Sequence, residues 1–105
     1  RVDCNEESRV IWVRTNDNNV TGTIPKELGS LELLADLSLT SGSLKGTLPY
    51  ELSQLNQLVS LDLNDNDLTG SLHDDQFWDP LRQLQYIDLA LNEFESTIPA
   101  GLGQN

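Results

Sequence analysis

The sequence predicts an α/β solenoid, a coil whose successive turns stack on one another to form one core. Three observations lead to this fold class. Apolar residues recur in four rows of similar length, their spacing within a row fits neither a lone strand nor a helix, and asparagine, glycine and proline return at fixed offsets. The rows begin at Val10, Leu34, Leu58 and Leu84 and define repeats 10–33, 34–57, 58–83 and 84–105.

The first part of each row is predicted to be a short β-strand. Apolar residues stand at row positions 1, 4, 6, 11 and 15, with Thr15 as the exception. Positions 3 to 5 fit a strand that turns the side chains at positions 4 and 6 inward, as with Leu37 and Leu39. One coil cannot bury its own apolar stripe, so we expect the strands of successive rows to stack into a parallel sheet.

The strand is followed by a sharp turn that needs extra hydrogen bonds. Row position 9 supplies Asn18, Asn66 and Asn92, whose amides can bond backbone groups left unpaired by the turn. We therefore predict that they form a structural asparagine ladder. Gly42 replaces the asparagine in the second row, so we expect a local gap or a water molecule there.

The second half of each row is predicted to bend and return through a short helical turn. Position 13 is Gly22, Gly46 and Gly70, which suits a tight bend. Position 16 is Pro25, Pro49 and Pro99, and proline there can open a helical turn. Glu27 and Glu51 fall in the first turn, where a carboxylate favours the helix dipole.

Composition excludes several classes of partner. The 105 residues carry a formal net charge of −11, which repels nucleic acid and anionic membranes. No apolar run approaches the roughly 20 residues of a membrane span, so no direct membrane insertion by this segment is expected. The sequence lacks an initiator methionine and ends in mid-pattern, which we interpret as a fragment of a longer polypeptide.

The stretches "NNVTGTIPKELGSL" and "GSLKGTLPYELSQL" closely resemble the plant-type leucine-rich repeat, LxxLxLxxNxLxGxIPxxLxxL. This family includes receptor-like kinase ectodomains, polygalacturonase-inhibitor-like proteins that act on cell-wall hydrolases, and similar surface proteins of some algae. The resemblance covers about residues 10–105. It implies a right-handed coil with the parallel sheet on the concave face, 3-10 or short helical turns on the convex side, and passage through the secretory pathway.

The head of the chain also resembles the family, in which a cysteine-paired cap often precedes the first repeat. "DCNEESRVIWV" places Cys4 just before that repeat, so residues 1–9 would be the end of an N-terminal cap. The resemblance implies that Cys4 pairs with a cysteine outside this sequence; the alternative is a lone buried or free thiol.

The rows depart from the family pattern at a few positions. The third row has His73 in place of proline and two extra residues in the segment 73–81, "HDDQFWDPL". Row four has Ser96 in place of glycine, and row one has Thr15 in place of leucine. Phe77 and Trp78 in the insertion either form an exposed binding knob or supply a side chain to the core, and the second interpretation is favoured.

Outward-facing strand positions supply the candidate ligand-binding residues. On stacked strands they would form columns on the concave face, and the set is Trp12, Arg14, Asp36, Ser38, Ser60, Asp62, Asn64, Asp65, Tyr86 and Asp88. Their carboxylates would steer a basic protein or peptide to this face, whereas the alternative is a merely solvated acidic surface. Trp12 and Tyr86 are the aromatic anchors an interface would favour, although Trp12 could instead pack against the cap.

No metal, cofactor or catalytic site is predicted. Asp62, Asn64 and Asn66 start like a calcium-binding loop, but the sixth and twelfth positions are Asp67 and His73 rather than glycine and glutamate. His73 with two neighbouring aspartates gives poor ligand convergence, and the chain has one histidine and one cysteine. Asn19 begins a glycosylation sequon, which matters only in a secreted protein.

These observations predict a non-catalytic module that recognises proteins or peptides. The first hypothesis is the extracellular repeat segment of a receptor-like or adhesion protein, with its signal and any anchor outside this sequence. The second is a secreted inhibitor of a cell-wall hydrolase that uses the same face. The third is a structural or accessory subunit of a larger assembly, in which a partner stacks on the open C-terminal end.

Overall fold

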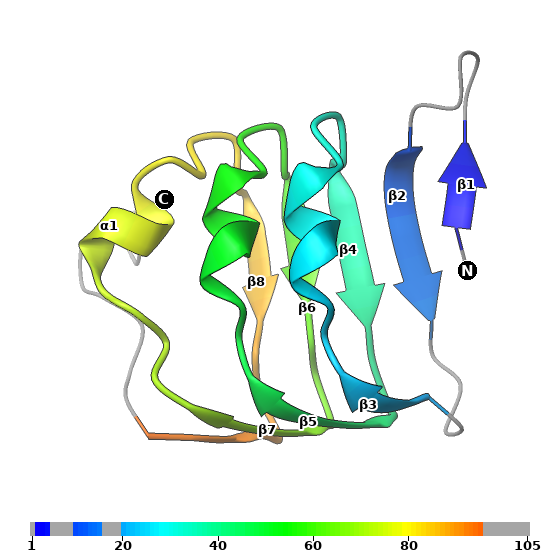
Figure 1. Cartoon of the computed structure of the whole chain (residues 1–105), viewed down its shortest axis with the longest axis vertical. Coiled ribbons are helices and arrows are strands. Elements are labelled where there is room, and N and C mark those ends of the chain that lie inside the picture. Colours follow the sequence, from blue (N-terminus) through cyan, green and yellow to red (C-terminus); the bar gives the residue numbers. More distant parts are fainter. Residues whose placement is uncertain (1, 5–9, 16–19, 96–105) are drawn as a thin grey trace.

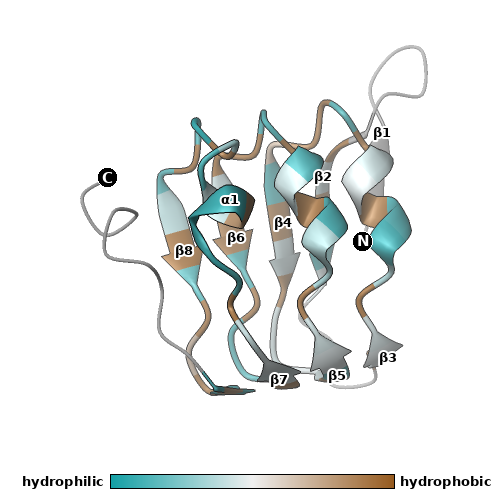
Figure 2. Ribbon diagram, turned by 60° about the vertical axis from the view of Figure 1, so that its left-hand side comes forward, coloured by the Kyte–Doolittle hydropathy of each residue, from teal (hydrophilic) through white to brown (hydrophobic). Residues whose placement is uncertain are grey.

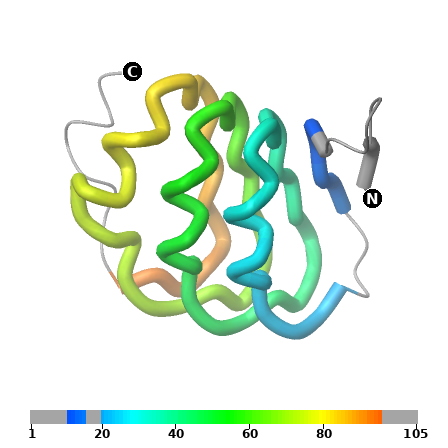
Figure 3. Tube along the Cα trace, turned by 45° about the horizontal axis from the view of Figure 1, so that its top comes forward, coloured from blue at the N-terminus to red at the C-terminus, as the bar shows by residue number. Residues whose placement is uncertain are grey.

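The structure, a computed structural model, describes residues 2–4, 10–15 and 20–95, with only the backbone at residues 2–4 and 10. Within these ranges the chain winds as a solenoid whose coils lie side by side (Figure 1, Figure 3). The predicted fold class, with a parallel sheet on one side and 3-10 turns on the other, is confirmed.

The predicted strands form the main sheet of the molecule. Its order is β1-β2-β4-β6-β8, with the strands at Val2–Cys4, Val10–Thr15, Asp36–Leu39, Ser60–Asp62 and Tyr86–Asp88. Strands β2, β4, β6 and β8 pair in parallel, because the chain runs in the same direction each time a new coil returns to the sheet. Strand β1 pairs antiparallel with β2.

A second parallel sheet, which the sequence analysis did not predict, runs along one edge of the solenoid (Figure 1). Its order is β3-β5-β7-β9, with the strands at Thr21–Thr23, Ser43–Thr47, Asp67–Gly70 and Glu93–Phe94. Each of the first three strands contains the predicted bend glycine, with φ of +90° at Gly22 and +84° at Gly46 and Gly70. The bend therefore lies inside a strand.

The return segments are short helices on the opposite side from the main sheet. The 3-10 helices η2 and η3 span Lys26–Ser30 and Tyr50–Gln54, and Pro25 and Pro49 directly precede them. The third coil instead forms an α-helical turn, α1, at Asp75–Trp78. Asp74 caps it by accepting a hydrogen bond from the Gln76 backbone N–H at 3.1 Å, so the cap replaces the missing proline.

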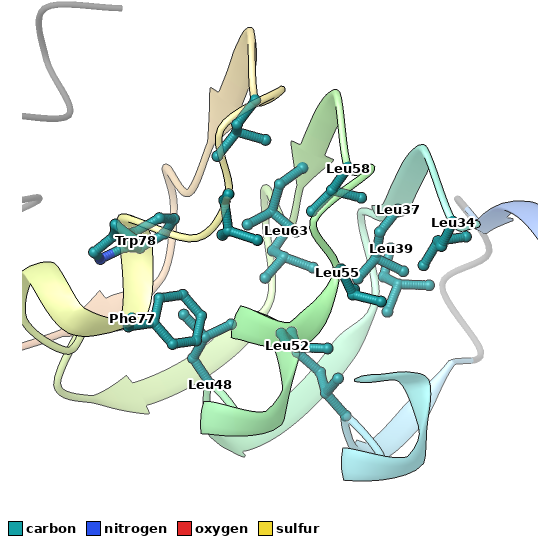
Figure 4. Close-up of a cluster of buried hydrophobic side chains, with 14 of the residues drawn as sticks. Leu34, Leu37, Leu39, Leu48, Leu52, Leu55, Leu58, Leu63, Phe77 and Trp78 are labelled. Carbon is teal, nitrogen blue, oxygen red and sulfur yellow. The ribbon is translucent and has the colours of Figure 1, made fainter. Parts of the chain in front are cut away.

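The core lies between the main sheet and the helices and consists mainly of stacked leucines (Figure 4). The hydropathy-coloured ribbon shows apolar bands repeating from coil to coil (Figure 2). The strand residues Leu37 and Leu61 and the return-segment residues Leu55 and Leu58 are all at most 1% exposed. Each fully buried side chain stabilises the fold by roughly 1.5–3 kcal/mol, so the stacking of coils holds the solenoid together.

The row-three insertion contributes two aromatic residues to this core. Phe77 is 0% exposed and Trp78 is 3% exposed, so the exposed-knob interpretation is wrong. The polar group of Trp78 is satisfied in the core, because its indole N–H donates to the Leu72 carbonyl at 2.7 Å. The rings of Phe77 and Trp78 meet edge to face with centroids 4.7 Å apart.

Candidate binding face

The outward side chains of the main sheet form two aligned columns. Strand register places Trp12, Asp36, Ser60 and Tyr86 side by side in one column, and Arg14, Ser38, Asp62 and Asp88 in the other. The residues between them along the strands, such as Leu37 and Leu61, point into the core. We call the surface made by these two columns the sheet face.

At the β2–β4 end of the sheet face, three side chains form one contact group. The Arg14 guanidinium bonds the same carboxylate oxygen of Asp36 through Nη2 at 2.6 Å and Nε at 3.0 Å. Its central carbon also lies 5.2 Å from the centre of the Trp12 ring. An exposed ion pair adds at most about 1 kcal/mol to stability, so its main effect is to hold the guanidinium beside the indole.

At the β6–β8 end, a different group gathers around Asp88. Its Oδ1 accepts from the Ala90 backbone N–H at 3.0 Å, and its Oδ2 accepts from the Asn64 side-chain amide at 3.1 Å. The Tyr86 hydroxyl lies 3.5 Å from the same Oδ2. Asp62, the register partner of Asp88, uses its Oδ1 to accept from the Asn64 backbone N–H at 3.1 Å.

The carboxylates at this end create a negative field at Tyr86. The pKa of Tyr86 is raised from its ordinary value of 10.0, mainly because the charge of Asp62 repels a phenolate, with smaller contributions from partial burial and from Asp88. Among the described residues, Arg14 with Asp36 is the only ion pair. Within the described ranges, the charge of Asp36 at the β2–β4 end is thus matched by Arg14, whereas Asp62 and Asp88 at the β6–β8 end form no ion pair.

The turns after β4, β6 and β8 each place one residue in the left-handed backbone region. Ser41, Asp65 and Leu91 occupy this equivalent position with φ of 54°, 65° and 57°. Asp65, a predicted binding residue, is exposed at this rim of the sheet face. The left-handed backbone of Leu91, which is 69% exposed, could not be predicted from the sequence, because leucine is uncommon in that region.

Asn66 and Asn92 lie where the predicted ladder requires them, and the side chain of each makes hydrogen bonds to the backbone of the preceding coil. The Asn66 amide donates to the Leu39 carbonyl at 2.7 Å and accepts from the Leu44 N–H at 3.2 Å. Asn92 repeats both bonds one coil later, to the Leu63 carbonyl at 2.8 Å and from the Leu68 N–H at 3.0 Å. The third predicted member, Asn18, lies outside the described residues.

The space directly beside the Gly42 backbone is filled. A Cβ added at Gly42 would lie 3.0 Å from the Asn66 side-chain oxygen and 3.0 Å from the Val20 carbonyl. The asparagine of the next coil and the neighbouring backbone therefore occupy the position of a Cβ at Gly42, and the expected gap or water further along the missing side chain stays a prediction.

The remaining predicted residues lie elsewhere. Asn19, the sequon residue, is outside the described residues, and Cys4 is described only as part of the backbone of β1. The His73 ring is occupied, since its Nε2 lies 2.7 Å from the Leu48 carbonyl and its plane stacks on Phe77 at 4.6 Å. Within the described ranges, no group of three or more His, Cys, Asp or Glu side chains is placed to hold a metal ion.

No helix in the described part of the chain is both long enough and apolar enough to cross a membrane.

The fold and the repeated strand, asparagine and glycine positions define a leucine-rich repeat solenoid. The family model described as Leucine Rich Repeat matches residues 57–76. No curated protein sequence matches the chain significantly. Solved structures do, and they agree with the resemblance to the plant-type family.

The structure of PEPR1-AtPEP1 matches with a TM-score of 0.87 and 27% identity over 96% of this chain and 14% of that chain. The ectodomain of the Arabidopsis thaliana receptor kinase GASSHO1/SCHENGEN3, in complex with CASPARIAN STRIP INTEGRITY FACTOR 2, matches with a TM-score of 0.81 and 32% identity. The match covers 90% of this chain and 11% of that chain. The Arabidopsis receptor kinase HAESA, in complex with the peptide hormone IDA and the co-receptor SERK1, matches with a TM-score of 0.81 and 32% identity. The match covers 91% of this chain and 16% of that chain.

This chain is therefore a leucine-rich repeat solenoid similar to the ectodomains of plant receptor kinases, as its sequence predicted. It spans only 14%, 11% and 16% of the length of these three structures.

Proposed function

We propose that this chain is a non-catalytic recognition module that binds a protein or peptide on its sheet face. The observation that carries this proposal is the alignment of outward aromatic and charged side chains across four parallel strands. Trp12 and Tyr86 stand at the two ends of one column, and aromatic side chains contribute strongly to binding energy at interfaces. Similar structures were solved with a peptide hormone or a co-receptor bound, which supports the same role for this chain.

The proposed setting is the extracellular part of a receptor-like or adhesion protein. It is supported by the likeness to ectodomains of plant membrane receptor kinases. In such a setting Asn19 would be a glycosylation site, and Cys4 would pair within an N-terminal cap formed partly by residues 1–9. The four repeats 10–33, 34–57, 58–83 and 84–105 stay a prediction, which is supported because each contains one strand of the main sheet and one strand of the second sheet.

Stacking of a partner or a further coil at the C-terminal end is part of this proposal. Ile87, Leu89 and Phe94, the inward residues of the last described coil, are only partly buried, whereas the equivalent Leu61, Leu63 and Leu68 are at most 1% exposed. This difference supports a contact there without identifying its chemistry.

The test is selection of ligands from a random peptide library against the 105-residue chain, followed by comparison of two charge variants. D62K reverses a charge on the sheet face, and D67K makes the same change on exposed Asp67 of β7 in the second sheet. Binding of the selected peptides is expected to fall with D62K and to persist with D67K. Peptides that bind both variants equally well would place the interaction elsewhere and contradict the proposal.

A further inference from the structure

The two ends of the sheet face have different chemistry. The β2–β4 end carries an indole with a guanidinium beside it, and the charge of that guanidinium is balanced by Asp36. The β6–β8 end carries the carboxylates of Asp62 and Asp88 next to Tyr86, which is 50% exposed. A ligand that crosses the strands therefore meets an aromatic, electrically balanced surface first and a negative surface with an exposed phenol ring second.

The distance between these ends corresponds to a defined spacing along a ligand. Trp12 and Tyr86 are separated by three strand-to-strand steps in one column, or about 14 Å at the usual spacing of about 4.8 Å. An extended peptide advances roughly 3.3 Å per residue, and alternate side chains point to the same side. Residues i and i+4 of such a peptide are about 13 Å apart and face the same surface.

We propose that the sheet face binds an extended segment in which an apolar side chain and a Lys or Arg side chain stand four positions apart. The apolar side chain packs on Trp12 and Arg14, and the cationic one lies between Asp62 and Tyr86. This inference rests on the proposed function and specifies the class of ligand that the face selects.

The contacts available at each end fit these two side chains. Asp62 uses one oxygen for the Asn64 backbone N–H, and a carboxylate has about four lone-pair sites, so it can still accept from a cation. The half-exposed Tyr86 ring offers a cation–π contact beside it. At the other end, Arg14 is held by Asp36, which presents its flat guanidinium together with the indole as a platform for an apolar group.

Charge complementarity selects this occupant over an acidic one. The chain carries a net charge of −11, and among the described residues of the sheet face Arg14 is the only cation, already paired with Asp36. An acidic segment would be repelled by Asp62 and Asp88 at the β6–β8 end.

The experiment uses short Ser/Gly peptides that carry one Leu and one Arg at spacings from i+2 to i+6, in both orders. Dissociation constants are measured by titrating the isotope-labelled 105-residue chain and following its amide resonances. We expect the i+4 peptides to bind at least about threefold more tightly than the i+3 and i+5 peptides, because odd spacings point the two side chains to opposite sides.

Two isosteric variants isolate the cationic contact. D62N removes the charge but keeps an oxygen for the Asn64 N–H, and it should weaken the i+4 Leu/Arg peptide about two- to fivefold while leaving a Leu-only peptide unchanged. D67N makes the same charge change on the second sheet and should leave both affinities unchanged. Unchanged binding of the i+4 peptide to D62N, or equal loss in D67N, would overturn the inference.

The outcomes also separate this inference from the proposed function. Peptides that shift sheet-face resonances equally at every spacing would overturn the spacing rule and leave a recognition face in place. If library-selected ligands and all designed peptides shift no resonance of β2, β4, β6 or β8, both proposals fail.

Discussion

Replacement of the buried Asn66 by alanine tests the asparagine ladder most directly. Asn66 is 6% exposed, and its amide reaches across to the preceding coil at the Leu39 carbonyl and the Leu44 N–H. Alanine at position 66 removes the donor to the Leu39 carbonyl and the acceptor of the Leu44 N–H at once. Since each buried group left without a partner costs about 1–3 kcal/mol, and two backbone groups lose theirs, we expect the free energy of unfolding to fall by about 2–4 kcal/mol.

The assay is equilibrium unfolding in urea, followed by far-ultraviolet circular dichroism and by tryptophan fluorescence, to which the buried Trp78 contributes together with Trp12. N64A is the matched control, because Asn64 lies two residues earlier and its side chain bonds only the half-buried carboxylate of Asp88. It should cost less than about 1 kcal/mol. If N66A were as stable as the parent chain, or if N64A cost more than N66A, the assignment of Asn66 to the ladder would be wrong.

Three further outcomes are expected. G29A should destabilise the fold by about 1–3 kcal/mol in the same urea assay, because its new Cβ would lie 2.3 Å from the Glu51 backbone carbonyl oxygen. T15V should stabilise the fold by up to about 1–2 kcal/mol, because the buried Thr15 hydroxyl has no hydrogen-bond partner among the described residues. The phenol of Tyr86 should titrate above pH 10.0 in an ultraviolet titration, and D62N should lower its pKa toward that value.

Each of these outcomes has its own control. Ser53 occupies the position in η3 that Gly29 occupies in η2, and S53A should be nearly neutral because a Cβ is already present there. A loss in S53A equal to that in G29A would show that backbone crowding is not the cause. For T15V, a net loss of stability would mean that the Thr15 hydroxyl is satisfied.

The titration is performed in a Y50F background, so that Tyr86 is the only tyrosine. Because its pKa is raised in the folded state, the unfolded chain releases the proton first, and the stability linked to this group is complete below pH 10 and is lost as pH rises through the folded pKa. High salt should reduce the shift, since the carboxylate charges act through solvent at an exposed ring. A Tyr86 pKa that D62N leaves unchanged would refute the dominant role of Asp62.

The register of the main sheet was predictable because burial depends on which side of a strand a residue occupies. Leu37 and Leu61 stand at the same row position, and any slip by one residue would expose both. The two columns of the sheet face follow from that register alone.

The second sheet was not predictable from apolar alternation. Its first strand, Thr21–Thr23, reads TGT and carries no large apolar residue, so it has no pattern of period two. It forms because the coils already stack through the core and bring these segments into pairing distance. The link from Arg14 to Asp36 was likewise hidden, because it joins two different columns through a long side chain whose conformation the register does not fix.

The ladder explains how the coils depend on one another. Each asparagine satisfies the backbone of the preceding coil, so the turn in the second coil depends on Asn66 in the third. Gly42 cannot do the same for the first coil, where the Thr15 carbonyl instead accepts from the Thr40 backbone N–H at 2.9 Å and has the Thr40 hydroxyl at 3.4 Å. The contact between the first and second coils therefore has a glycine where the later coils have a bridging asparagine, and it leaves the Thr15 hydroxyl without a partner, so it is the weakest of the described ladder contacts. Local opening should therefore begin at that contact, on the β2 side of the sheet face. The third coil stays bonded to the second coil through Asn66 and to the fourth coil through Asn92.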